Sequence, residues 1–229
     1  KEYGAAPSAE LRWNGHMFAA GQPLVTLVSR NLEPLRGLRQ ALLAWPAIAA
    51  AVPDAQLLLV GDRGQGHGME LPPAGDDHLS AALKAMPNWV NHQRIHWLGT
   101  LEHSKMVQLL QVSACHLALS YPYTLSWSVL EAMACGAALV SNHGSPIAPE
   151  LIDGHNGLLV PFNDHHALAQ AVIGLLNHPA RRTQIGTAAL HTIKQHFSLT
   201  KSLESYEQLF QQLTQTGGES RQRSSAVSS

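Results

Sequence analysis

Short apolar runs alternate along this chain with longer segments in which apolar residues recur every three or four positions. The runs predict strands buried on both faces, and they lie at residues 23–30, 55–61, 94–99, 115–120 and 137–142. Residues 153–160, DGHNGLLV, supply turn residues and a short final strand. The segments between them have the helical period and predict helices at residues 38–52, 78–89 and 104–112 and from Ser126 onward. Because this alternation is typical of a parallel, doubly wound sheet, we expect an α/β, Rossmann-like fold.

The two ends of the chain have a different pattern. Residues 1–22 are polar and begin without a methionine, so we expect an irregular lead and a missing N-terminal part of a longer protein. Two or three helices are expected over residues 164–213. Residues 214–229 have no apolar period and predict a disordered tail. These boundaries leave one domain at residues 23–213.

Composition argues against two kinds of partner. The 15 Lys and Arg residues balance 16 Asp and Glu residues, so no basic surface is expected for nucleic acid. The most apolar window, residues 41–61, is interrupted by two prolines and an aspartate, which predicts a helix, a turn and a strand rather than a membrane span. Cys115 and Cys135 lie in apolar surroundings and predict buried thiols, which fits a reducing compartment.

Candidate chemistry is expected where the strands of the sheet end. Ligands of doubly wound sheets bind outside the carboxyl ends of the strands, beside helix N-termini. The loops that should form this rim follow Arg30, Gly61, Gly99, Ser120 and Asn142.

Arg30 and Arg36 lie in the first of these loops. Two guanidinium groups suit a pyrophosphate, because each can donate forked, charge-assisted hydrogen bonds. The alternative is a pair of solvated loop arginines.

The sequence YPYTLSWSVLEAMACG, residues 121–136, places a helix start at a second point of the rim. The unpaired amides and the positive dipole end of a helix that begins at Ser126 favour an anion. Glu131, one turn into this helix, has two interpretations. It either closes a capping box with Ser128 or accepts hydrogen bonds from the hydroxyls of a ribose.

The glycine-rich and histidine-rich features predict no established site. Residues 61–68, GDRGQGHG, match neither G-x-G-x-x-G nor a Walker loop, and they predict either a flexible rim loop near a ligand or a plain surface loop. The 14 histidines include no H-E-x-x-H, and the rim has no Asp-x-Asp pair. We therefore expect no metal and no cofactor.

Five motifs in order resemble the C-terminal, donor-binding domain of retaining GT-B glycosyltransferases of family 4. They are VSRNLEPLRG, AQLLLVGD, RIHWLGTLEHSKMVQLLQVSACHLALSYPY, LSWSVLEAMACGAALVSN and PELIDGHNGLLV, and the resemblance extends over about residues 23–213. It implies a nucleotide-sugar donor and a cleft that this domain forms with an N-terminal acceptor domain, which is missing from the chain. It also implies a cytoplasmic location, with contact to the inner face of the cell membrane decided by the missing half.

The resemblance implies roles for individual positions. Arg30 and Arg36 match the Arg and Lys that bind the donor diphosphate. Glu131 matches the second glutamate of an E-x7-E motif, which accepts from the ribose hydroxyls. Tyr123 stands where the first glutamate is usual, so the contact with the donor sugar differs here. Further donor-binding positions are implied at Gly61, at Leu98 and Leu101 near the nucleobase, and at Leu125, Ser126, Trp127 and Ser128.

The leading hypothesis is glycosyl transfer from a nucleoside diphosphate sugar to an acceptor with retention at the anomeric carbon. Arg30 and Arg36 would stabilise the charge that develops on the leaving diphosphate, and no metal takes part. Two alternatives stay open: a GT-B epimerase or phosphorylase, and a nucleotide-sugar sensor or scaffold, which Tyr123 favours. A dehydrogenase fits least, because no glycine fingerprint follows the first strand.

Overall fold

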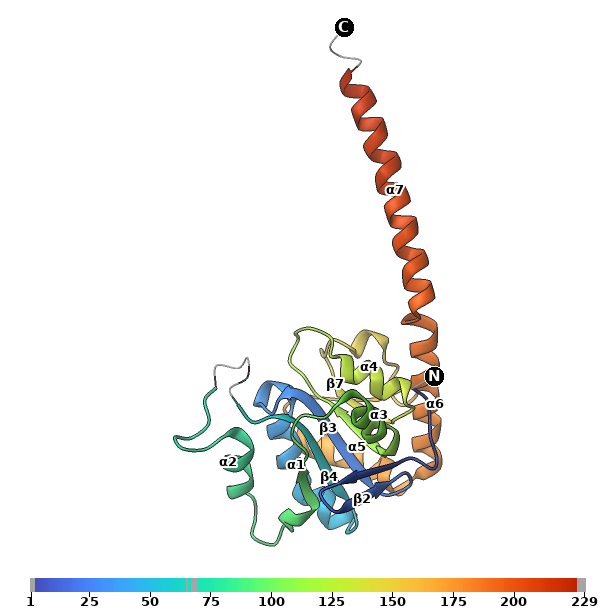
Figure 1. Ribbon diagram of the computed structural model, residues 1–229. Helices are drawn as coiled ribbons and strands as arrows, with labels where there is room; N and C mark the ends of the chain where they lie inside the picture. The colour runs from blue at the N-terminus through green and yellow to red at the C-terminus, as the bar shows by residue number, and fades with distance from the viewer. Residues whose placement is uncertain (1–2, 65, 67–69, 226–229) are drawn as a thin grey trace. The chain divides into compact units, whose positions relative to one another are not determined.

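A parallel β-sheet forms the centre of the structure. The computed structural model describes residues 3–64, 66 and 70–225, with side chains described as far as residue 214. In this part of the chain, six parallel strands are ordered β5-β4-β3-β6-β7-β8 (Figure 1). The strands are β3 (Leu24–Asn31), β4 (Gln56–Asp62), β5 (Ile95–Trp97), β6 (Cys115–Ala118), β7 (Leu139–Asn142) and β8 (Leu158–Val160). The predicted α/β fold with a parallel sheet is confirmed.

Helices connect these strands as the apolar periods predict. The helices of this region are α1 (Leu38–Ala51), α2 (His78–Lys84), α3 (His103–Val112), α4 (Trp127–Ala134), α5 (His165–Asn177) and α6 (Pro179–His196), with short 3-10 turns at η1 (Pro34–Arg36), η2 (His92–Arg94) and η3 (Ala148–Glu150). α2 ends five residues before the predicted boundary at Trp89. Pro87 explains the difference, because a proline disfavours the helical conformation of the residue before it.

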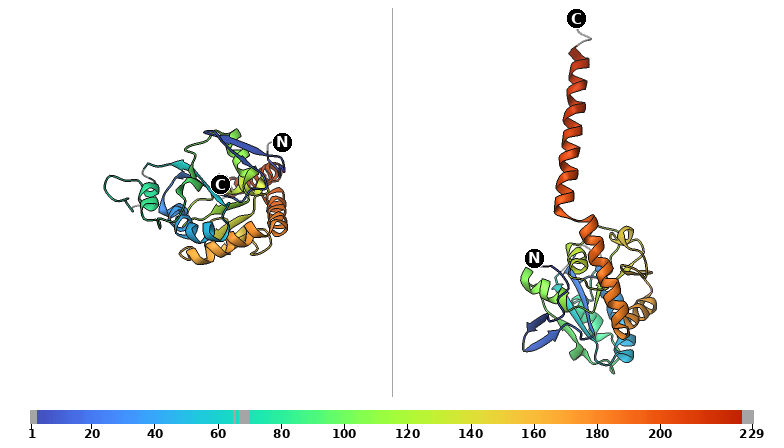
Figure 2. Two further views of the ribbon diagram at one scale, coloured as in Figure 1. Left: turned by 90° about the horizontal axis from the view of Figure 1, so that it is seen from below. Right: turned by 90° about the vertical axis from the view of Figure 1, so that its right-hand side faces the viewer.

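Both faces of the sheet are buried, and alternate strand residues serve opposite faces. Leu57 and Leu59 belong to a buried cluster that includes residues of α1 and α5. Leu58 and Val60 belong to a second cluster with residues of α3 and of an N-terminal hairpin. In the left-hand view of Figure 2, α1 and α5 lie along one side of the sheet and the hairpin along the other.

This hairpin differs from the irregular lead expected over residues 1–22. β1 (Glu10–Trp13) pairs antiparallel with β2 (His16–Ala19) across a two-residue turn. Asn14 and Gly15 form the turn with φ angles of 44° and 80°, as an Asn-Gly pair favours. Each strand has four residues, too few for alternation to stand out from the sequence.

The C-terminal part of the chain also differs from its prediction. The chain divides into two units, Lys1–His191 and Thr192–Ser229, and the second contains the end of α6 and α7 (Leu199–Ser225). α7 continues past residue 214, where a disordered tail was predicted from the end of the apolar period, because extending an existing helix costs less than starting one and needs no apolar face. Residues 226–229 of that prediction lie outside the described residues. No described helix has both the length and the apolar character needed to cross a membrane.

The strand order creates the crevice that positions the site. β3 pairs with β4 on one side and with β6 on the other, so the connections from these strands leave toward opposite edges. In doubly wound sheets such a reversal opens a crevice at the carboxyl ends of the two central strands. The expected rim therefore has its centre at the end of β3.

α6 packs against the end of α4 through two glycines. A Cβ atom added to Gly186 in α6 would lie 2.0 Å from the carbonyl oxygen of Gly136, which follows α4. Gly174 in α5 is a natural control, because a Cβ added there meets no atom within 4 Å. Close backbone approach, rather than flexibility, explains the glycine at position 186.

We predict opposite effects for alanine at these two helical glycines. Gly186→Ala forces the two segments apart and should lower the free energy of unfolding by about 1 to 3 kcal/mol. Gly174→Ala should raise it by roughly 0.5 to 1 kcal/mol through helix propensity. Urea denaturation of both variants measures the difference, and equal effects at the two positions would contradict the packing described.

Candidate functional site

A cleft of about 980 Å³ lies at the predicted rim. It is lined by the ends of β3 and β4, by Arg36, by the loop after β5, by Met106 of α3, and by residues 123–128 at the start of α4. Of the site residues predicted from the sequence, those that line it are Arg30, Arg36, Gly61, Leu101, Tyr123, Leu125, Ser126, Trp127 and Ser128. The cleft thus brings together segments separated by about a hundred positions of sequence.

Two predicted residues lie outside this lining. Leu98 is buried in the core, and its N–H donates to the carbonyl of Leu59 at 2.9 Å. Its neighbour Leu101 takes part in the lining. Glu131 lies one turn beyond Ser128 on α4, and its carboxylate contacts Tyr3 and His103.

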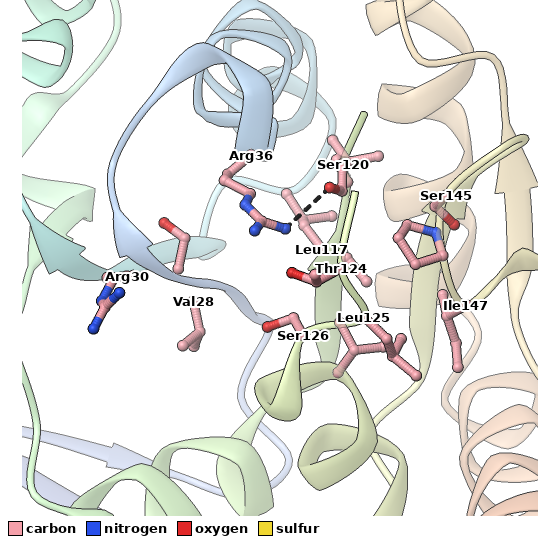
Figure 3. Close-up of a pocket in the computed structure, with 15 residues that line it drawn as sticks. Val28, Arg30, Arg36, Leu117, Ser120, Thr124, Leu125, Ser126, Ser145 and Ile147 are labelled. Carbon is pink, nitrogen blue, oxygen red and sulfur yellow. Dashed lines mark hydrogen bonds between the residues drawn. The ribbon is translucent and has the colours of Figure 1, made fainter. Parts of the chain in front are cut away.

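Arg36 is held at the cleft by neutral groups. It ends η1, and its Nη1 donates to the Ser120 hydroxyl at 3.1 Å, as Figure 3 shows. Its guanidinium carbon lies 5.2 Å from the centre of the Tyr123 ring, a cation–π arrangement. Gly37 allows the chain to turn here, because it has a φ of 79° and a Cβ atom would lie 2.3 Å from Cβ of Leu119.

Ser120 is itself positioned by a buried asparagine. Asn142, at the end of β7 and 2% exposed, accepts from the Ser120 N–H at 2.8 Å and donates to the Ser120 carbonyl at 3.0 Å. From the sequence, both residues were predicted only as strand ends. Each is a polar residue at the end of an apolar run, and this feature could have indicated that their side chains take part in the site.

Arg30 reaches the cleft from a distortion of β3. The pairing of β3 with β4 shifts register between Val28 and Asn31, where a bulge redirects the side chains. The Arg30 guanidinium makes no hydrogen bond or ion pair with any described residue. Its side chain is exposed, so its positive charge stays available to a ligand.

The start of α4 supplies backbone donors to the same cleft. Ser126 is the N-cap residue, and its hydroxyl lies 2.8 Å from that of Ser128 rather than on a backbone amide. Within the described chain, no hydrogen-bond acceptor is recorded for the amides of Trp127 and Ser128. The capping box with Ser128 as its first residue does not form, because the helix begins two residues earlier.

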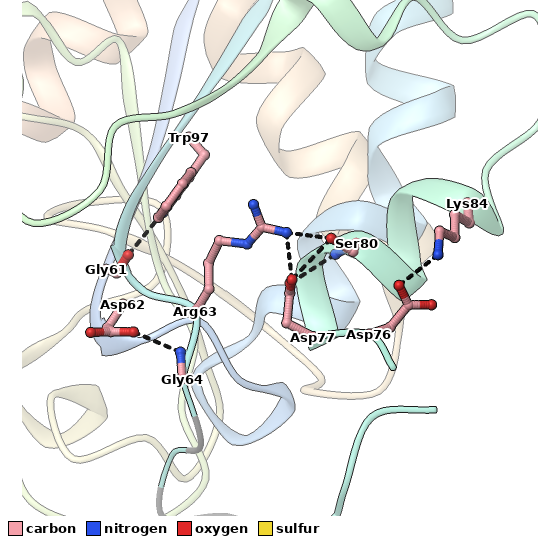
Figure 4. A network of polar contacts seen from close by, with 9 residues as sticks. All are labelled: Gly61, Asp62, Arg63, Gly64, Asp76, Asp77, Ser80, Lys84 and Trp97. Carbon is pink, nitrogen blue, oxygen red and sulfur yellow. Dashed lines mark hydrogen bonds and ion pairs between the residues drawn. The ribbon is translucent and has the colours of Figure 1, made fainter. Parts of the chain in front are cut away.

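Gly61 and Trp97 shape the part of the cleft at the ends of β4 and β5. A Cβ atom at Gly61 would lie 2.5 Å from the Ser29 carbonyl oxygen, so only glycine fits between β3 and β4. The Trp97 indole N–H donates to the Gly61 carbonyl at 2.9 Å. The Arg63 guanidinium covers the Trp97 ring at 4.8 Å (Figure 4).

Arg63 also connects the glycine-rich stretch to α2. It pairs with Asp77, the N-cap residue of α2, and donates to Ser80. Asp62 accepts from the Gly64 N–H at 2.6 Å. The start of the loop predicted to be flexible is therefore anchored, while residues 65 and 67–69 of it lie outside the described residues. This cluster was not predicted from the sequence, because a lone arginine in a glycine-rich loop does not indicate its partners.

The electrostatics of this cluster lower the pKa of Asp77. Burial raises the pKa of Asp77, but the hydrogen bonds from Arg63 and Ser80 and the charge of Arg63 outweigh burial and hold the pKa at about 2, below its usual 3.8. No group of three or more His, Cys, Asp or Glu side chains in the described part of the chain could hold a metal ion.

Comparison with known proteins identifies the family. The family model described as glycosyl transferases group 1 matches residues 22–178, more than half of the chain. The chain belongs to this glycosyltransferase family. It spans between 35% and 45% of the length of the curated relatives that it matches.

Three similarities are informative for this family member. The GDP-mannose-dependent monoacylated alpha-(1-6)-phosphatidylinositol monomannoside mannosyltransferase of Corynebacterium glutamicum is 28% identical over 190 residues, which cover 79% of this chain and 45% of the relative. The Anabaena protein HepE, solved with UDP-glucose, superposes with a TM-score of 0.65 at 19% identity, over 84% of this chain and 49% of HepE. The C-terminal domain of a group 1 family protein from Francisella tularensis gives 0.63 at 13% identity, over 77% of this chain and 86% of that domain. The two structures share the fold of this chain.

The Arg63–Asp77 pair predicts that the loss of stability in Asp77→Asn depends on pH. Asp77→Asn keeps a helix-capping side chain but removes the ion pair, and should lower the free energy of unfolding at pH 7 by about 0.5 to 1 kcal/mol. Because the folded pKa is depressed, this contribution is present above about pH 4 and is lost as pH falls through about 2. Urea unfolding of the wild type and of Asp77→Asn at pH 7 and at pH 2.5 measures the difference between their free energies of unfolding. If this difference does not shrink at pH 2.5, the Arg63–Asp77 ion pair does not contribute as described.

Proposed function

We propose that the cleft binds a nucleoside diphosphate sugar and that this chain is the donor-binding domain of a retaining glycosyltransferase. The observation that carries the proposal is the convergence of Arg30, Arg36 and the first amides of α4 on one cleft at the reversal of strand order. A GDP-mannose-dependent relative and a structural neighbour solved with UDP-glucose support a nucleotide-sugar ligand.

The diphosphate is assigned to the end of the cleft formed by the arginines and α4. Guanidinium groups and helix N-termini both favour phosphate, the first by charge-assisted hydrogen bonds and the second through unpaired amides and the helix dipole. The nucleoside then extends toward Gly61 and Leu101. Glu131, on the face of α4 that continues from Ser128, is assigned to the ribose hydroxyls.

Catalysis in this scheme is electrostatic. As the bond between the anomeric carbon and the diphosphate breaks, negative charge grows on the leaving group, and fixed positive charges lower the energy of that state. Arg30 and Arg36 supply these charges without a metal ion and without a protein nucleophile.

Tyr123 has a physical role in this arrangement. A carboxylate at its position could pair with the Arg36 guanidinium and take up its hydrogen-bond donors. The Tyr123 ring attracts the guanidinium through its π face and leaves those donors to a ligand. The substitution therefore favours diphosphate binding, while the contact that a first glutamate would make with the sugar is absent or replaced by the phenol.

The acceptor is assigned to a part of the protein outside this chain. The chain spans less than half of its curated relatives and is similar over most of its length to a C-terminal domain. Transfer requires donor and acceptor held in register, so the chain alone should bind donor without transferring sugar. We propose a glycolipid or polysaccharide acceptor and a cytoplasmic site of action at the membrane surface.

A sensor or scaffold domain is the second candidate, and Tyr123 is the observation that favours it. Such a protein would bind nucleotide sugar as this chain is proposed to do. It would differ in that the full-length protein turns over no donor in the presence of any acceptor.

The proposal predicts a specific loss at Arg36. Arg36→Ala should weaken nucleoside diphosphate binding by about 1.5 to 3 kcal/mol, roughly 10- to 150-fold, because charge-assisted hydrogen bonds to phosphate are lost. Arg39→Ala is the matched control, since Arg39 is exposed on α1 and pairs with Glu70 at 3.6 Å. Isothermal titration measures both affinities, and thermal unfolding checks that both variants fold. Equal affinity of Arg36→Ala and the wild type would remove Arg36 from the site.

A further inference from the structure

The Glu131 carboxylate is engaged on one oxygen only. The Tyr3 hydroxyl donates to Oε1 of Glu131 at 3.0 Å, and Nδ1 of His103 lies 3.7 Å from the same oxygen. Among the described residues the Glu131 carboxylate makes no further hydrogen bond or ion pair, so its Oε2 atom has no hydrogen-bond partner there. A carboxylate can accept about four hydrogen bonds, and those on Oε2 are unused.

Tyr3 and His103 also contact each other. The Tyr3 oxygen lies 3.2 Å from Nε2 of His103, and the two rings meet edge to face with centres 5.9 Å apart. The single phenol hydrogen is directed to Glu131, so the Tyr3 oxygen accepts from the Nε2–H of His103. The result is a directed chain from His103 through Tyr3 to Glu131, and such chains strengthen each hydrogen bond through polarisation.

The segment that carries Tyr3 is attached to the domain. The Gly4 carbonyl accepts from the Gln111 side chain of α3 at 3.2 Å. α3 also carries His103 at its first position, so one helix holds the backbone next to Tyr3 and supplies its ring partner. The three members of the cluster come from the N-terminal segment, α3 and α4.

We propose that Tyr3 and His103 are positioning residues that fix Oε1 of Glu131 and present Oε2 to the hydroxyl groups of the nucleoside. This inference rests on the proposed function, because it takes the nucleotide as the ligand. A free glutamate side chain must lose rotamer freedom when it binds a ligand, whereas one already held by the Tyr3 hydroxyl, which His103 in turn orients, has lost part of it. The Glu131 side chain is 21% exposed, so it is not sealed from solvent.

The test is titration of the 229-residue chain with UDP and GDP, using Tyr3→Phe as the main variant. This change removes one hydroxyl and keeps the ring that packs on His103. We expect a loss of affinity of roughly 3- to 12-fold, which corresponds to one hydrogen bond. Tyr206→Phe, in α7 of the second unit, is the matched control and should bind as the wild type does.

Two further measurements distinguish a positioning role of Tyr3 from a general effect of Tyr3→Phe on the fold. Inorganic pyrophosphate has no hydroxyl for Glu131, so its affinity should not change in Tyr3→Phe. In a Glu131→Ala background, Tyr3→Phe should cause no additional loss, because the residue through which it acts is gone. A structural defect would instead weaken pyrophosphate binding as well and would add to the effect of Glu131→Ala.

The outcomes distinguish this inference from the proposed function. Unchanged nucleotide affinity in Tyr3→Phe, with the loss in Arg36→Ala intact, overturns the positioning role and leaves the donor site standing. Tighter binding in Tyr3→Phe also overturns it, because Tyr3 would then compete with the ligand for Glu131. If the wild-type chain binds no nucleotide or pyrophosphate, the proposed function fails and this inference fails with it.

Discussion

The site depends on two positive charges that no carboxylate of the described residues pairs with. Arg36 is held by a hydroxyl and an aromatic ring, and Arg30 has no partner among the described side chains. Arginines next to carboxylates would already have their donors occupied, and a phosphate would have to displace those partners. Here the neighbouring groups orient the Arg36 guanidinium without cancelling its charge, which is the arrangement that the proposed diphosphate requires. The glycines at positions 37 and 61 permit this arrangement, because each lies where a Cβ atom would collide with the next segment.

The sheet determines where those charges lie. Runs of apolar residues buried on both faces dictate a parallel sheet, and the reversal of strand order at β3 opens the crevice into which Arg30, Arg36 and α4 project. Ser120 and Asn142 also lie at strand ends. The buried Asn142 amide at the end of β7 positions Ser120, whose hydroxyl accepts a hydrogen bond from Arg36. The cleft is thus lined by strand ends and by the start of α4, and the helices and strands behind them form the core.

The local sequence pattern was sufficient to predict the sheet, most of the helices and most of the residues that line the cleft. Arg30 lies at the end of a strand, Arg36 lies in the loop that follows it and Ser126 begins a helix, so their sequence positions imply positions on the rim. The contacts that local pattern could not give are those between distant segments. Tyr3 lies 128 positions from Glu131, and no periodicity connects them. The Asn14-Gly15 turn did carry a local signal, but its strands are short and their only deeply buried side chains are Leu11 and Phe18.

The most direct test of the account is a comparison of affinities along one series: nucleoside, nucleoside monophosphate and nucleoside diphosphate, for uridine and guanosine, with EDTA present. Recognition centred on the diphosphate predicts that affinity rises with each phosphate and increases at least about tenfold from nucleoside to diphosphate. It also predicts that this gain needs no metal. Equal affinity across the series, or binding that appears only when a divalent metal is added, would contradict the assignment of the arginine and α4 end of the cleft to the diphosphate.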